Sequence, residues 1–374
     1  MALGYRAGRT ARQVRELLAL LAAAGANHSL GLDASLAAVE LAGTAAADWP
    51  DSGSALRQSL AQGLLAQLTE AAVLLSTAAP LRARAGDALS RLGDPRFDTA
   101  RFSLPADERL GFEFIPADPG FMIGTRRKDA QRVAKASGGE AYDEEFNDEV
   151  TPAPAFHIAR YPVTVAQFRA FVEATGPPLG DDRALRDPDS RPVRNVSWRE
   201  ASAYCAWLQQ MLDESPALAT TAAAKGVRQQ GWRVALPSEL EWERAARGGL
   251  VGQVFTWGDG ADPQRANYNK SGIDNTSVVG CFAPNGHGLF DMVGNACEWT
   301  RSPWVDRYGP AMLRAEALNP GDDDSLVVRG GSWVNDADVA RCASRDGITP
   351  GLRASGLGFR VVLRSSPVSR AAGR

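Results

Sequence analysis

One stretch near the C-terminus, residues 334–356, constrains this chain more than any other part of it. It lies between two apolar runs, Val328–Trp333 and Leu357–Val362, whose β-branched and aromatic residues predict half-buried strands. The stretch itself shows neither a helical nor a strand period, and it contains no Lys, Glu, Gln, Met or Trp. We therefore expect a long loop between two strands, with residues selected by something other than core packing.

The composition indicates a folded protein of two unequal parts, because 374 residues exceed the usual size of one domain. A net charge of -3 provides no basic field for nucleic acid. The four cysteines form no C-x-x-C pair and the three histidines are dispersed, which argues against a zinc knuckle, a redox dithiol or a histidine metal cluster. Since no apolar run is long enough to span a bilayer, we expect a cytoplasmic protein without membrane insertion.

Residues 1–104 are expected to form a small helical domain. Leucines recur at helical spacing in 14–21, 56–68 and 81–92, and glycines follow the first and last of these segments. This antiparallel bundle, or fragment of a helical repeat, is expected to act as a spacer or to dock, either onto a partner or onto the rest of the chain.

Residues 105–366 change to aromatic and β-branched residues interleaved with turns, which predicts an α+β domain low in regular secondary structure. Strands are expected at 112–117, 121–124 and 156–161. Ser197 and Ser238, each followed three residues later by Glu, predict two helices that begin with capping boxes. The acidic segment 126–148 has no period, so we expect an exposed insertion there.

Several ordered motifs in this second part point to a known family. They are Trp198, Leu236-Pro-Ser-Glu239, Glu241-Trp-Glu243, Asn285-Gly-His-Gly-Leu289, Gly294-Asn-Ala-Cys-Glu-Trp-Thr300, Arg329-Gly-Gly-Ser332 and Gly358-Phe-Arg360. Together they resemble the formylglycine-generating enzyme (sulfatase-modifying factor) family over residues 112–363. The resemblance implies a C-type-lectin-like fold, and it leaves the N-terminal hundred residues outside.

The catalytic chemistry of that family is not expected here. Its active enzymes look to bind copper through two cysteine thiolates, the soft ligands that copper(I) needs. Asn335 stands at about the first of these positions, nothing near Val339 replaces the second, and Cys342 belongs to a framework motif. Related sulfoxide synthases use several histidines, partly from a helical N-terminal domain, where this chain has only His28. We therefore expect no enzyme activity and no catalytic cofactor.

Residues 330–362 also resemble the variable region of proteins diversified by retroelements, in which AAC codons of a template become NNC codons. Such codons cannot encode Lys, Glu, Gln, Met or Trp. The positions that this resemblance assigns to ligand binding are Trp333, Val334, Asn335, Asp336, Asp338, Val339, Ser344, Asp346, Gly347, Ile348, Thr349, Gly351, Leu352, Ala354, Ser355 and Gly356. Between them stand the fixed-looking residues Ala337, Ala340, Arg341, Arg345, Pro350, Arg353 and Leu357.

This resemblance leads to the hypothesis of a binding protein whose unidentified ligand is a protein or another macromolecule. Arg341, Arg345 and Arg353 are expected to anchor the loop through carboxylates or carbonyls. Trp333 is expected either at the rim or floor of the site or in the core beneath the last strand. The alternatives are a loop that lacks five residue types by chance, an oxidase or sulfoxide synthase with another metal arrangement, and a non-diversified module of a bacterial signalling or defence assembly.

The family resemblance also implies a structural calcium site. Its ligands would be oxygens of Asp291, Gly294, Ala296 and Glu298, which suit a hard cation. The alternative for Glu298 is a buried carboxylate that accepts hydrogen bonds from backbone N–H groups.

Overall fold

The structure is a computed structural model that describes residues 11–26, 31–49, 52–176, 179–309, 316–317 and 319–365. His28 and both ends of the chain lie outside these residues. No helix within the described ranges is long and apolar enough to cross a membrane.

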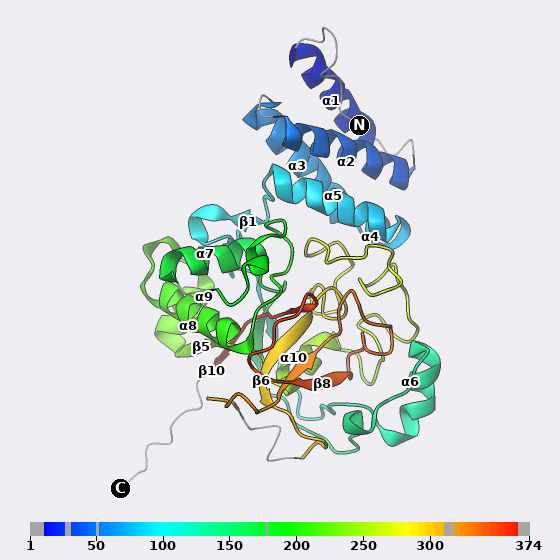
Figure 1. The fold of residues 1–374 in the computed structure, drawn as a ribbon, viewed down its shortest axis with the longest axis vertical. Helices are drawn as coiled ribbons and strands as arrows, with labels where there is room; N and C mark the ends of the chain where they lie inside the picture. Colours follow the sequence, from blue (N-terminus) through cyan, green and yellow to red (C-terminus); the bar gives the residue numbers. More distant parts are fainter. Residues whose placement is uncertain are drawn as a thin grey trace.

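The N-terminal part is helical, as its leucine periodicity predicted. Its helices are α1 (Ala11–Ala26), α2 (Leu32–Asp48), α3 (Ser54–Leu68), α4 (Ala71–Ser76) and α5 (Ala79–Leu92). Leu36, Leu60, Leu64 and Leu89 are fully buried among them and form their shared core. Figure 1 shows these helices stacked at one end of the molecule, with α5 nearest the rest of the chain.

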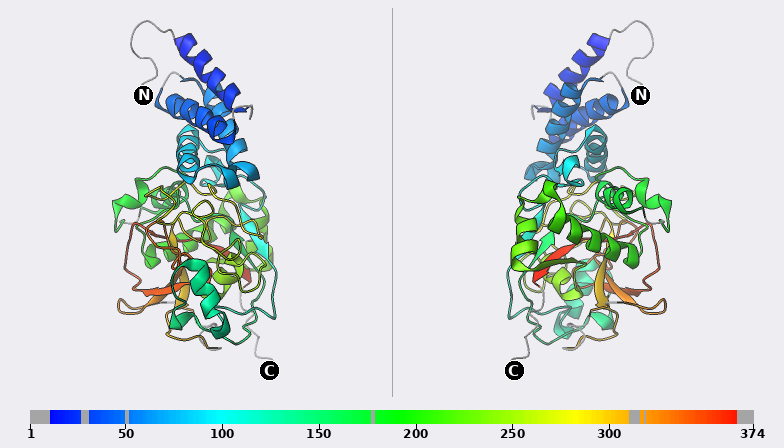
Figure 2. Two further views of the ribbon diagram at one scale, coloured as in Figure 1. Left: turned by 90° about the vertical axis from the view of Figure 1, so that its right-hand side faces the viewer. Right: turned by 90° about the vertical axis from the view of Figure 1, so that its left-hand side faces the viewer.

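Helix α5 packs directly on the second part of the chain. Asp87 of α5 accepts hydrogen bonds from Arg191 at 2.9 and 2.7 Å. Ala79 is buried against Cys281 and Phe282. A Cβ at Gly86 would lie 2.7 Å from the sulfur of Cys281, so glycine allows the close approach. Both side views of Figure 2 show the helices joined to the larger part at this one end.

Two sheets of four strands organise the larger part. The first is antiparallel, with the order β3 (Phe112–Ile115), β4 (Phe156–Ala159), β10 (Val362–Ser365) and β5 (Trp232–Ala235). The second has the order β8 (Arg345–Ile348), β7 (Leu326–Arg329), β6 (Cys297–Pro303) and β9 (Leu357–Gly358), in which only the β6–β9 pair is parallel. A short pair, β1 (Phe97–Asp98) with β2 (Leu104–Pro105), follows α5.

The helices of this part are α6 (Ala130–Ser137), α7 (Val165–Thr175), α8 (Trp198–Glu214), α9 (Ala222–Gln230) and α10 (Glu239–Ala246). Both predicted capping boxes are confirmed, at the first turns of α8 and α10. Each of these serines accepts a backbone N–H three residues on, and the Glu at that position accepts the serine N–H in return.

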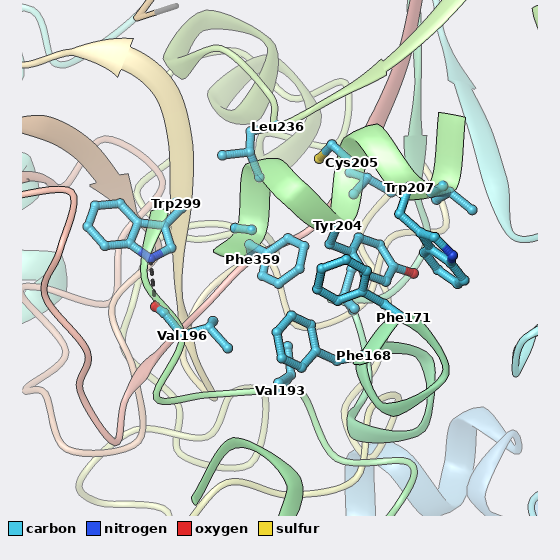
Figure 3. Close-up of a cluster of buried hydrophobic side chains, with 14 of the residues drawn as sticks. Phe168, Phe171, Val193, Val196, Tyr204, Cys205, Trp207, Leu236, Trp299 and Phe359 are labelled. Carbon is cyan, nitrogen blue, oxygen red and sulfur yellow. Dashed lines mark hydrogen bonds between the residues drawn. The ribbon is translucent and has the colours of Figure 1, made fainter. Parts of the chain in front are cut away.

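Aromatic side chains fill the space between α7, α8 and the sheets. Phe168, Phe171, Tyr204 and Phe359 have ring centroids 5.4–6.3 Å apart in tilted, stacked or edge-on pairs (Figure 3). Trp299 of β6 is fully buried and donates its indole N–H to the carbonyl of Val196 at 3.0 Å. These rings supply the packing that long regular elements supply in other folds.

Three expectations from the sequence were wrong. Residues 345–348 form strand β8 inside the stretch that was predicted to be a loop, and residues 121–124 form no strand. The segment 126–148 is not a purely exposed insertion, because it contains α6 and the fully buried Glu145. Strand β8 is fixed by its pairing with β7, and Glu145 is buried against the distant Arg341.

Candidate ligand-binding surface

Buried arginines hold the stretch after β7 in place. Arg341 donates from both terminal nitrogens to the two carboxylate oxygens of Glu145, at 2.7 Å each. Arg345 pairs in the same two-pronged way with Glu239 of α10, at 2.6 and 2.9 Å. Arg353 donates to Glu200 of α8 at 3.0 Å. The predicted anchoring through carboxylates is confirmed for all three arginines.

Buried pairing between arginine and carboxylate side chains also occurs beneath the stretch. Arg329 of β7 is buried and pairs with Glu239 and Glu243. Burial by itself would raise the pKa of Glu243, but the charges of Arg247 and Arg329 outweigh it and lower that pKa. Glu243 is therefore ionised and fully paired at neutral pH, as a buried charge must be.

Trp333 joins the two ends of the stretch. Its indole N–H donates to the carbonyl of Ser355 at 3.1 Å, and its side chain is half-buried. Gly356 comes so near to Ser332 that a Cβ there would lie 2.5 Å from the hydroxyl oxygen. Trp333 thus lies at the base of the surface and is not a core residue beneath the last strand.

Burial separates the predicted ligand-binding positions from the fixed-looking ones. Exposed positions are Val334, Asp336, Asp346, Thr349, Gly351, Leu352 and Ser355. Half-buried positions are Trp333, Asn335, Asp338, Val339, Gly347, Ile348 and Ala354. The fixed-looking Ala337, Ala340, Arg341, Arg345, Pro350 and Leu357 are all buried, and Arg353 is half-buried. Two apolar side chains among the first group reach solvent, Val334 at 50% and Leu352 at 42% exposure.

Three of the predicted positions do not fit a freely varied surface. Ser344 and Gly356 are buried, so neither faces a ligand. A Cβ at Gly347 would lie 2.6 Å from the ring of Trp304, so a larger residue there displaces that ring. The neighbours of Gly347 and Gly356 come from other parts of the chain, which local sequence does not reveal.

Asn335 has a structural role in this chain. Its side-chain oxygen accepts the backbone N–H of Ser332 at 2.9 Å and the hydroxyl of the same residue at 2.7 Å. The carbonyl of Asn335 accepts the backbone N–H of Asn269 at 3.0 Å. Asn335, which stands at about the position of the first copper-binding cysteine in the resembling family, therefore closes a turn in this chain.

The four cysteines are free, and their surroundings do not favour thiolates. Burial raises the pKa of Cys297 and of Cys342 to about 12. Cys205 and Cys281 are likewise buried, and burial raises the pKa of both thiols. Over the described part of the chain, no cluster of three or more His, Cys, Asp or Glu side chains is arranged to hold a metal ion.

The proposed calcium ligands do not fit a complete site. Glu298 accepts three bonds from the guanidinium of Arg360, at 2.7–2.9 Å, and one from the indole N–H of Trp242 at 2.7 Å. A cationic side chain thus already satisfies this carboxylate, which is buried and hydrogen-bonded as in the alternative, but to side chains and not to the expected backbone N–H groups. Burial raises the pKa of Asp291 to about 6, against the ionised form that calcium requires. Calcium stays a prediction.

Sequence reasoning missed the acidic partners and two neighbours of the surface. Tyr142 is exposed and donates its hydroxyl to Asp338 at 3.1 Å. Asn269 donates its side-chain amide to Asp336. Both residues lie far from residues 333–356 in the sequence. No local sequence pattern identifies Tyr142 or Asn269 as neighbours of the surface. For the arginines, the two-pronged geometry of the guanidinium predicts that a carboxylate partner exists, but not which residue supplies it.

The two sheets, the buried tryptophans and the arginine-held stretch define a C-type-lectin-like domain of the formylglycine-generating enzyme type. The sequence profile of the family described as "Sulfatase-modifying factor enzyme 1-like domain" matches residues 124–365. The chain belongs to this family.

The relatives include proteins named as active and as inactive. The chain is 34% identical over 271 residues to the "Inactive C-alpha-formylglycine-generating enzyme 2" of Mus musculus, covering 66% of this chain and 72% of that protein. It is 29% identical over 277 residues to the "Formylglycine-generating enzyme" of Bos taurus, covering 69% of this chain and 64% of the relative.

Two solved structures are similar to this chain, and the first of them supports the fold. PvdO from Pseudomonas aeruginosa is similar with a TM-score of 0.51 and 26% identity, over 67% of this chain and 93% of that one. Treponema denticola variable protein 1 is similar with a TM-score of 0.49 and 24% identity, over 68% of this chain and 94% of that one.

Proposed function

We propose that this chain is a non-catalytic binding protein whose exposed side chains between Val334 and Ser355 contact a protein or another macromolecule, and that a retroelement diversifies these side chains. The observation that carries the proposal is the separation by burial. Positions that match the varied pattern are mostly exposed or half-buried. The residues between them are mostly buried, and the buried arginines among them pair with distant carboxylates. Recognition surfaces require this division, since contact residues can then change without loss of the fold.

The chemistry of the exposed side chains supports recognition of a large partner. Aspartates, a serine and a threonine supply adaptable hydrogen bonds, while Val334 and Leu352 supply small apolar contacts. Trp333 provides a rigid aromatic base between the two ends of the stretch. Side chains that project from an exposed stretch suit a partner surface better than a small molecule, which needs a cavity.

The absence of a two-sulfur centre supports a non-catalytic role. Copper(I) needs soft thiolate ligands. Asn335 offers an amide oxygen that is already bonded to Ser332, and the pKa of the Cys342 thiol is raised by burial. The competing hypothesis is an oxidase, because some relatives are named formylglycine-generating enzyme. Metal analysis of the purified full chain distinguishes the two hypotheses. Copper or iron at one per chain contradicts a non-catalytic role.

A genomic comparison tests diversification separately. We expect a reverse transcriptase gene nearby, together with a near-copy of the coding segment for residues 330–362 that differs from it at adenines of the copy. Differences spread evenly over all four bases, or no copy at all, would contradict diversification and leave a fixed binding module.

Display of the full chain tests binding. In one library Val334, Asp336, Asp346, Thr349, Leu352 and Ser355 are varied; in a matched control library, exposed positions of α2 and α3 are varied instead. We expect selection against a single test protein, lysozyme, to enrich specific binders from the first library only. Equal enrichment from both libraries, or none from the first, contradicts a built recognition surface.

A further inference from the structure

A cavity of about 90 Å³ lies beside α6 and the first residues after α10. One buried water needs roughly 10–15 Å³, so this cavity is large enough for a small organic molecule. Its lining comes from the segment 118–133, from α10 with the loop after it, and from Arg341 and Ala343. The cavity is therefore separate from the exposed side chains of the proposed recognition surface.

Apolar side chains form much of the cavity wall. Phe121, Val133 and Val254 line it and are buried, with exposures of 7%, 4% and 4%. Leu250 and Val251 also line it, yet they are 41% and 90% exposed. Exposed apolar side chains on a glycine-rich loop next to an apolar cavity are typical of a ligand entrance.

The arginines that line this cavity, with one exception, have close partners. Arg247 donates to Glu243 at 2.6 and 3.0 Å and to the carbonyls of Gly124 and Gln253 at 2.8 and 2.7 Å. Close carboxylates also neutralise the other three: Arg126 with Asp129, Arg132 with Asp259, and Arg341 with Glu145.

Arg244 is the exception. Its residue is only 7% exposed, and its Nε atom is buried without a hydrogen-bond partner in the structure. The carboxylate paired with it, Asp118, lies 3.5 Å from Nε and is itself 37% exposed. One terminal nitrogen of Arg244 contacts Nε2 of His287 at 3.0 Å. Burial and the charge of Arg244 both lower the pKa of His287, so this neighbour is neutral and adds no negative charge to the weak pairing with Asp118.

We propose that this cavity binds a small organic acid, with the carboxylate on Arg244 and a short apolar body against Phe121, Val133 and Val254. A buried guanidinium with an unused donor is costly, and a carboxylate is the group that its planar fork fits best. The apolar wall favours an acid with a hydrocarbon body over an inorganic anion. This site and the proposed recognition surface stand independently of each other.

Butyrate is the probe, with butyramide as the neutral control of the same shape. Both are titrated into the full chain at constant ionic strength, and binding is followed by calorimetry and by chemical shifts. We expect butyrate to bind at least about tenfold more tightly than butyramide, since a hydrogen bond between two charged groups is stronger than one to a neutral amide. Equal binding of the two compounds, or no binding of butyrate, overturns the proposal.

Two substitutions move the affinity in opposite directions. Arg244→Gln removes the charge, so butyrate should bind about tenfold more weakly. Asp118→Asn removes the competing carboxylate while its side-chain oxygen still accepts the N–H of Gly120, so butyrate should bind several-fold more tightly. Arg183→Gln, on an exposed arginine paired with Asp181, is the control and should leave the affinity unchanged.

The opposite signs separate a binding site from a structural role, because a general loss of stability cannot tighten binding. If Arg244→Gln does not fold, Asp118→Asn decides the question. Unchanged or weaker butyrate binding by Asp118→Asn overturns the site.

Discussion

Arginines and aspartates of the stretch from Trp333 to Leu357 lie in opposite environments. Arg341 and Arg345 are buried and bonded at both prongs to Glu145 and Glu239, which lie 106 or more residues away. Asp336 and Asp346, only a few residues along the chain, are exposed. Stability and recognition are thus assigned to different side chains of one segment, and each kind is expected to tolerate different changes.

The energetic contrast between the two kinds of position is large. Removal of one partner from a buried ion pair leaves an uncompensated charge and typically costs ~3–5 kcal/mol. Substitution at an exposed position without special contacts usually changes stability by less than about 0.5 kcal/mol. Four substitutions or conditions, taken from the largest expected effect to the smallest, sharpen or break this contrast.

The largest effect is expected from Arg341→Met. It leaves the carboxylate of Glu145 buried and unpaired, so the free energy of unfolding should fall by ~3–5 kcal/mol in urea titrations. The double variant Arg341→Met with Glu145→Leu removes both charges and should recover most of this loss. A single variant as stable as the wild type would show that the pair does not hold the stretch.

Acid should weaken the same framework. Burial opposes ionisation of Glu241 and Glu243, but their arginine partners outweigh it and lower both pKa values below 4.5, the ordinary value for a glutamate. Stability from these pairs is therefore complete above about pH 4.5 and is lost as the pH falls through the lowered pKa values.

Asp291 changes stability in the opposite direction. Because burial raises its pKa to about 6, the folded state binds the extra proton, and stability from this group falls as the pH rises from about 4 to 6. Urea titrations at several pH values measure both trends. A flat profile between pH 3 and 6 would contradict them.

A smaller effect is expected from Arg353→Met. The side chain of Arg353 is 29% exposed and its bond to Glu200 is in partial contact with solvent. Such pairs contribute about 0–1 kcal/mol, so the loss should be several-fold smaller than for Arg341→Met. Equal losses for the two arginines would remove the distinction between buried anchors and the edge of the surface.

The smallest effect concerns calcium. Since Arg360 already satisfies Glu298, calcium added to chelator-treated protein should leave the melting temperature unchanged. Binding at a hundred times its Kd would stabilise the folded state by ~2.7 kcal/mol. A rise in melting temperature of that order would restore the calcium site that the family resemblance implies.

Sequence patterns predicted the parts of the fold that depend on local interactions. The capping boxes at Ser197 and Ser238 require residues only three positions apart, and both formed as expected. Strand β8 was missed because Arg345–Ile348 has no strand period of its own and is fixed by its pairing with β7. The burial of Glu145 was missed for the same reason, since Arg341 lies 196 residues away.

The candidate surface was predictable in outline only. The residue types missing from 334–356 and the fixed-looking positions between the varied ones both follow from the sequence. The limits on Gly347 and Gly356 do not, because they arise from Trp304 and from Ser332 across the fold. Arg244 is equally invisible in sequence: the missing hydrogen bond at its Nε and the 3.5 Å distance from Nε to Asp118 exist only in the folded chain.

Simultaneous replacement of the exposed side chains tests the central claim most directly. In one variant Val334, Asp336, Asp346, Thr349, Leu352 and Ser355 are all exchanged for other residues, and its urea unfolding is compared with that of the wild type. If this segment separates recognition from stability, the summed loss stays below about 3 kcal/mol, since independent exposed sites each change stability by less than about 0.5 kcal/mol. A loss of unfolding free energy as large as that of the single variant Arg341→Met would contradict the claim, as would a variant that does not fold.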